Sequence, residues 1–249
     1  AYVDEIRLVF IPQVAAALAA LKAGQLDWAQ VAAYDEVAKL QEDPDRFKIY
    51  LSKPGALADI MVNMHPDNLL GKNPKGDLLR RAIWLAQDSK SMMSSLGPSQ
   101  FWSMHHNVFF ENTVWSSDAG KDIWEHHDIE EAKKLVAESG YDGEPIRCSY
   151  TVGNASQQGW CLTISDLLTS KLGMNATAEA AERAAHLPIR LAPDRAELLA
   201  TGFNSLTSGY PLNNLGIDQG FYHWQDENMV QLTRDFASAN TYEEQKVVA

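Results

Sequence analysis

Pairs of adjacent histidines are the only concentrations of metal-capable side chains in this 249-residue sequence. They are His105-His106 and the EHHD run at 125–128. Metal sites on helices need ligands three or four residues apart on one face, as in the HExxH pattern. Neighbouring histidines on a helix or strand point in different directions, so each pair offers one ligand at best. Surface histidines explain both pairs better, and a metal-dependent hydrolase is the least favoured hypothesis.

Nucleophile and phosphate-binding motifs are absent from the sequence. It contains no GxSxG, no GxxxxGK[ST], and no GxGxxG after a predicted strand. Cys161 lies in a predicted helix beside Trp160, a setting typical of a buried structural thiol. Cys148 and Cys161 are the only cysteines, and the sequence leaves open whether they form a disulfide. We therefore predict that the protein is not an enzyme and uses no cofactor.

Tryptophans are numerous, and several fall in predicted loops or at the ends of elements. The sequence has seven, and these four lie in such places: Trp102, Trp115, Trp124 and Trp224. Flat apolar walls with a few nearby Asn, Gln and Ser side chains are what a small-molecule pocket uses. For any one of them packing is the favoured explanation, but as a set they favour a binding protein.

The elements that must position these residues alternate between strands and helices, which is typical of an α/β fold. Hydrophobic patterns predict strands at 5–11, 26–31, 47–52, 58–64, 146–152, 174–180 and 203–207. They predict helices at 13–23, 34–42, 78–87, 129–139, 157–171, 193–201, 227–237 and 241–249. Asp77 and Asp128 are the expected N-caps of two of these helices.

Composition and charge narrow the classes of partner. The formal net charge of −12 argues against nucleic acids and anionic membranes, because their phosphates repel such a surface. No apolar run approaches the roughly 20 residues of a membrane span. No signal peptide precedes the first predicted strand, as expected for a secreted protein without its leader or for an excised segment.

Four segments in register resemble one family, the periplasmic solute-binding proteins of the peptide/nickel class, which serve ABC importers. The first is IRLVFIPQVAAALAALKAGQLDWAQV and the second is GDLLRRAIWLAQDSKSMM. The third is HDIEEAKKLVAESGYDG, similar to the family's Asp-x-x-x-Ala-x-x-Leu-x-x-x-Gly-Tyr helix. The fourth, WCLTISDLLTSKLGMNATAEA, is similar to a later helix that ends in Leu-Gly before a strand.

The resemblance implies a periplasmic-binding-protein-like lobe of type II, with a mixed sheet flanked by helices. It implies that residues 1–30 are a crossover from an N-terminal lobe and that 31–249 form the C-terminal lobe. Both the N-terminal lobe and a final return to it are then missing. Two such lobes close around a ligand and present it to an ABC permease in the inner membrane. A monomer in the periplasm, or on the extracytoplasmic face of a bacterial membrane, is expected, and a sensory or chaperone-type domain is the alternative.

The loops that hold ligand in dipeptide-binding relatives lack their usual charges here. TSGYPLNNLG (207–216) replaces the usual acids, and TVGNASQQGW (151–160) contains no Arg or Lys. Because buried peptide termini need charged partners, a sugar or another uncharged polar solute fits about as well as a peptide. Each Asn could instead be a turn former. The predicted ligand-binding residues are Trp102, Asn154, Gln157, Gln158, Tyr210, Asn213 and Asn214.

Overall fold

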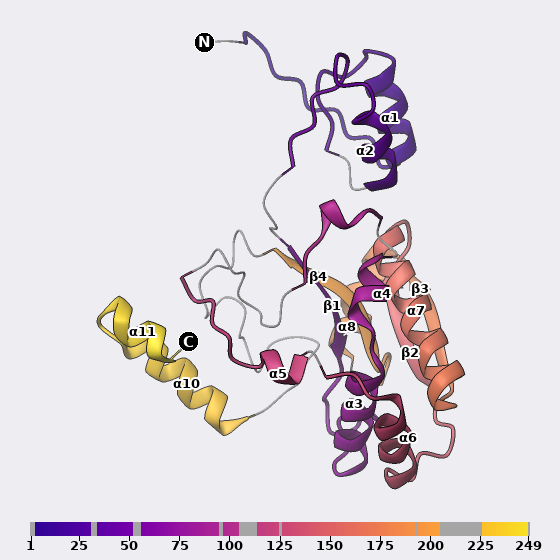
Figure 1. Ribbon diagram of the computed structural model, residues 1–249, viewed down its shortest axis with the longest axis vertical. Coiled ribbons are helices and arrows are strands. Elements are labelled where there is room, and N and C mark those ends of the chain that lie inside the picture. Colours follow the sequence, from indigo (N-terminus) through magenta and orange to yellow (C-terminus); the bar gives the residue numbers. More distant parts are fainter. Residues whose placement is uncertain are drawn as a thin grey trace. The chain divides into compact units, whose positions relative to one another are not determined.

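The computed structural model divides the chain into two compact units (Figure 1). The smaller unit contains residues 1–51 and 97–101, and the larger contains 52–96 and 102–249. The structure describes residues 3–30, 34–51, 56–94, 97–104, 114–124, 126–192, 194–204 and 226–248.

The larger unit is built on a four-stranded mixed sheet with strand order β1-β4-β2-β3. The strands are β1 (Ala56–Val62), β2 (Ile146–Thr151), β3 (Ala176–Ala181) and β4 (Leu198–Asn204). β2 runs parallel to both β3 and β4, whereas β1 pairs antiparallel with β4. With helices against this sheet, the predicted mixed α/β architecture is confirmed.

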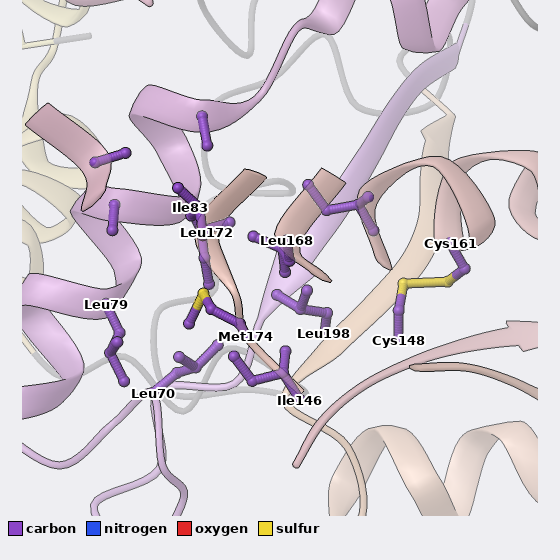
Figure 2. Close-up of a cluster of buried hydrophobic side chains, with 14 of the residues drawn as sticks. Leu70, Leu79, Ile83, Ile146, Cys148, Cys161, Leu168, Leu172, Met174 and Leu198 are labelled. Atoms are coloured by element: carbon purple, nitrogen blue, oxygen red, sulfur yellow. A yellow bond between two sulfur atoms is a disulfide. The ribbon is translucent and has the colours of Figure 1, made fainter. Parts of the chain in front are cut away.

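Three helices bury one face of the sheet: α3 (Lys75–Ala86), α6 (Ile129–Glu138) and α7 (Ala155–Leu172). Side chains of β2 alternate, so Ile146 and Cys148 enter this core while Arg147 lies on the other face. Figure 2 shows how side chains from separate elements meet in the core. Its fully buried members include Leu70, Leu79, Ala82, Ile146, Ile164, Leu168, Met174, Leu198 and Ala200.

Helix ends follow from short polar residues and glycines. Asp128 is the N-cap of α6, and its carboxylate accepts a hydrogen bond from the Glu131 backbone N–H at 2.9 Å, as predicted. Gly173 ends α7 with a φ of 67°, the left-handed conformation that glycine adopts without strain. The predicted Asp77 cap is wrong, because α3 begins two residues earlier and places Asp77 in its first turn.

The chain between β3 and β4 differs from its prediction. The helix expected at 193–201 is wrong, since residues from Leu198 onward form β4 between β1 and β2. The helix instead precedes it, as α8 (Arg183–Leu191). Sheet pairing has therefore overridden the helical preference of the Ala- and Leu-rich sequence.

Short helices complete the larger unit: α4 (Ser89–Ser94), α5 (Lys121–Trp124), α10 (Glu227–Ser238) and α11 (Tyr242–Val248). α10 and α11 confirm the two predicted closing helices. Within the described ranges, no helix has the length and apolar character needed to cross a membrane.

The smaller unit contains α1 (Val14–Lys22), α2 (Tyr34–Leu40) and the 3-10 turn η1 (Ser99–Phe101). Both α-helices match their predicted positions. The strands predicted at 5–11, 26–31 and 47–52 are not observed in the part of this unit that the structure describes. A strand needs a hydrogen-bonded neighbour to become part of a sheet, and none of these described segments pairs with another.

Candidate ligand-binding edge of the sheet

The carboxyl ends of three parallel strands meet at one edge of the sheet. β2 ends at Thr151, β3 at Ala181 and β4 at Asn204, and the register of β2 with its two neighbours fixes a common direction. In open α/β sheets, ligands bind in the crevice outside the carboxyl ends of the strands. We use the name carboxyl edge for residues 151–158, at the end of β2, and 181–183, at the end of β3.

The segment 151–158 is the best-defined part of this edge, and we call it the β2–α7 loop although it includes the last residue of β2 and the first turn of α7. The Gln157 side-chain oxygen accepts a hydrogen bond from the Thr151 N–H at 3.0 Å. The Asn154 side chain caps α7 by accepting from the Gln157 N–H at 3.1 Å. The Val152 N–H donates to the Ala181 carbonyl at 2.9 Å and ties the loop to the end of β3. Two predicted ligand anchors, Asn154 and Gln157, therefore hold the loop in shape.

Gln158 is placed differently from its two neighbours. Its side chain is exposed and makes no hydrogen bond to any described residue, while its backbone N–H donates to the Asn154 carbonyl at 3.0 Å. Its amide is thus a polar side chain of this segment that could bind a ligand without loss of a hydrogen bond to a described residue.

The other predicted site residues are distributed as follows. Trp102 is half-buried in the coil after η1. Tyr210, Asn213 and Asn214 lie outside the described residues, as does Trp224. The structure therefore groups Asn154, Gln157 and Gln158 on one loop, and the role of the remaining residues stays a prediction.

Two of the tryptophans considered as pocket walls take part in packing. Trp115 is buried against Phe236 and Tyr242, with ring centroids 5.3 and 5.4 Å away. Trp124 makes an edge-to-face pair with Trp84 at 5.4 Å. These rings stabilise contacts between elements, the role that packing alone predicts for a tryptophan.

Charge is scarce and balanced at the carboxyl edge. No residue from 151 to 158 is ionisable at neutral pH. At the end of β3, the exposed Glu182 and Arg183 carry opposite charges. The described edge therefore has no basic side chain on the β2–α7 loop that could pair with a ligand carboxylate.

A disulfide joins Cys148 on β2 to Cys161 on α7, with 5.3 Å between their Cα atoms. Both residues are fully buried. The sequence had left their pairing open, because a separation of 13 residues does not reveal that strand and helix face each other.

The histidine pairs form no metal centre among the residues that the structure describes. His105 and His106 lie outside the described residues. His126 and His127 are exposed, and the adjacent Asp128 carboxylate caps α6. No group of three or more His, Cys, Asp or Glu side chains is positioned to hold a metal ion among the described residues.

The sequence model of the bacterial extracellular solute-binding proteins, family 5, matches residues 1–228. The chain therefore belongs to this family, in agreement with the resemblance seen in its segments. A comparison with curated protein sequences found no match.

Solved structures share the fold at low identity. NikZ from Campylobacter jejuni, in complex with Ni(L-His), has a TM-score of 0.76 at 16% identity, with 96% of this chain and 50% of that chain covered. AppA from Bacillus subtilis, in complex with a nonapeptide, has 0.72 at 16%, covering 96% and 49%. MelB from Agrobacterium fabrum, in complex with stachyose, has 0.72 at 15%, covering 95% and 42%. This chain thus spans about half the length of these proteins and has a periplasmic-binding-protein-like fold.

Proposed function

We propose that this chain captures a small polar solute outside the cytoplasm for an ABC importer. The observation that carries the proposal is the carboxyl edge, where three parallel strands end beside a loop of neutral polar side chains. Membership of a solute-binding family supports it. The buried disulfide supports an extracytoplasmic location, because disulfides persist in oxidising compartments.

In this proposal the larger unit forms one wall of a hinged two-lobe clamp, with residues 1–30 as the crossover from the other lobe. The coverage of about half of each solved relative supports this assignment. One wall supplies only part of the contacts that enclose a solute. The 249-residue chain by itself therefore binds weakly, and its partners in transport are a permease and a closing second lobe.

The ligand class that we propose is an uncharged polar solute such as an oligosaccharide. A peptide carboxylate buried at this edge would need a cationic partner; the loop at 151–158 has none, and Arg183 at the end of β3 is exposed next to the opposite charge of Glu182. Neutral amide side chains instead form hydrogen bonds with the hydroxyl and carbonyl groups of a solute. Stachyose, the ligand in the MelB complex, provides a suitable probe.

A titration followed by NMR tests the proposal on the 249-residue chain. We expect stachyose at millimolar concentration to shift amide resonances of 151–158 and 181–183, and to do so more than the tetrapeptide Ser-Thr-Ser-Ala (STSA) or Ni(L-His). Gln158→Ala should reduce these shifts, whereas Gln25→Ala, an exposed glutamine in the smaller unit, should not.

Two results would contradict the proposal. One is the absence of any shift at the carboxyl edge with all three probes. The other is tight binding by the isolated chain in calorimetry, because a single wall would then suffice. A larger response to STSA than to stachyose would overturn the uncharged ligand class alone.

A further inference from the structure

The disulfide encloses the same loop that forms the carboxyl edge. Cys148 lies three residues before the end of β2, and Cys161 lies in the second turn of α7. The covalent ring that they close contains residues 149–160, and so includes every position from Thr151 to Gln158.

The two cysteines of the ring are buried, whereas much of the segment between them is exposed. Cys148 and Cys161 are fully buried in the core, as Figure 2 illustrates, whereas Val152 is 50% exposed and Asn154 and Gln158 are also exposed. The hydrogen bonds that shape the exposed segment 151–158 lie near solvent. Such contacts open locally without global unfolding, and the crosslink restricts how far the loop departs when they open.

We propose that the Cys148–Cys161 disulfide is a positioning crosslink, which keeps loop 151–158 in its ligand-ready conformation. The ligand part of this inference rests on the proposed function. Removal of the crosslink allows more loop conformations, so ligand binding must then pay a larger ordering cost and becomes weaker. Cys148 and Cys161 contact no solute in this scheme and act through the loop.

Hydrogen exchange on the 249-residue chain separates positioning from plain stabilisation. The crosslink-free variant is Cys148→Ala with Cys161→Ala. Leu79→Ala is the matched control, because Leu79 is fully buried on α3 and its truncation lowers global stability with the disulfide intact. The probes are the Thr151 and Val152 amides of the loop, and the Asn63 amide is the reference, since it donates to the Glu197 carbonyl away from the loop.

We expect the Thr151 and Val152 amides to exchange roughly tenfold faster, or more, in the crosslink-free variant than in the control, after normalisation to Asn63. Equal acceleration of loop and reference amides would overturn the proposal, because the disulfide would then be a global stabiliser only. If the double alanine variant does not fold, Cys148→Val with Cys161→Ala retains more apolar volume and replaces it.

A second readout addresses the ligand. The stachyose-induced shifts of the loop should need a several-fold higher concentration in the crosslink-free variant and remain unchanged in Leu79→Ala. Faster exchange without weaker binding would overturn the link to the ligand. The exchange experiment contains no ligand, so its outcome is decided separately from that of the proposed function.

Discussion

At the scale of single residues, the buried carboxylate of Glu197 depends most on its partners, because a buried charge needs hydrogen bonds and an opposite charge. Only 4% of this residue is exposed. Arg147 donates to its two oxygens from Nε at 3.0 Å and from Nη2 at 2.8 Å, and the Arg147 backbone N–H donates at 2.8 Å. A bidentate pair of this kind is strong and directional, and the Glu197 carboxylate raises the pKa of the Arg147 guanidinium. The network lies at the start of β2 and β4, away from the carboxyl edge, so its role is structural.

Glu197→Ala should lower the free energy of unfolding by about 1.5–3 kcal/mol, because it removes the carboxylate that accepts the hydrogen bonds of Arg147, while the partly exposed guanidinium keeps its bond to the Asp194 carbonyl. Glu130→Ala is the control, since Glu130 pairs with Lys133 on the surface of α6 and its loss should change stability little. Urea unfolding of both variants measures the difference. Equal free energies of unfolding for Glu197→Ala and Glu130→Ala would show that the buried pair stabilises the fold no more than the surface pair.

Glu144 makes the stability of the protein depend on pH in the acid range. Partial burial alone would raise the pKa of its carboxyl, but the hydrogen bond from the Lys75 ammonium and the backbone N–H of Asp142 outweigh that effect and lower it to about 2. A lowered folded-state pKa contributes stability above the unfolded value near 4.5, and this contribution is lost as pH falls toward 2.

We therefore expect Glu144→Gln to lose less stability than the wild type between pH 5 and pH 3, a window that follows from the lowered pKa. The difference should be modest, about 1 kcal/mol, because solvent screens a carboxylate that is about one-third exposed. Urea midpoints at several pH values provide the measurement. Parallel pH profiles for both proteins would rule out Glu144 as a source of the acid response.

At the scale of elements, local sequence signals predicted the helices that have a capping residue or a terminal glycine at their ends. α6 has Asp128 before it and Gly140 after it, and α7 ends at Gly173. β4 could not be predicted in this way, because LLATGFN forms a strand only through its pairing with β1 and β2. Sheet formation depends on partners that are distant in sequence, whereas a helix cap depends on its neighbours.

The candidate site shows the same division between local and distant information. The sequence predicted a strand ending at 152 and a helix beginning at 157, whereas β2 ends at Thr151 and α7 begins at Ala155. The Asn154-x-x-Gln157 spacing is a readable capping signal. In the structure Asn154 is the N-cap of α7, and its part in ligand binding stays a prediction. The disulfide was not readable, because it depends on the contact of β2 with α7 in three dimensions.

At the scale of the whole molecule, the two units differ in how well they are stabilised. Among the described side chains of the smaller unit, the only buried hydrophobic residues are Leu18, Val37 and Leu40. Its segment at 5–11 has the alternation of a strand but leaves its apolar side chains in solvent. Ile6, Leu8 and Phe10 are 77%, 91% and 90% exposed.

A unit with so small a core should be marginal, because little apolar burial offsets its conformational entropy. In the 249-residue chain, we expect α1 and α2 amides to exchange close to unprotected rates, while α7 amides exchange only on global opening of the larger unit. Leu168→Ala should speed exchange in α7 and leave α1 unchanged, since the fully buried Leu168 belongs only to the larger core. Strong protection of α1 that Leu168→Ala also abolishes would contradict this, because the two units would then unfold as one.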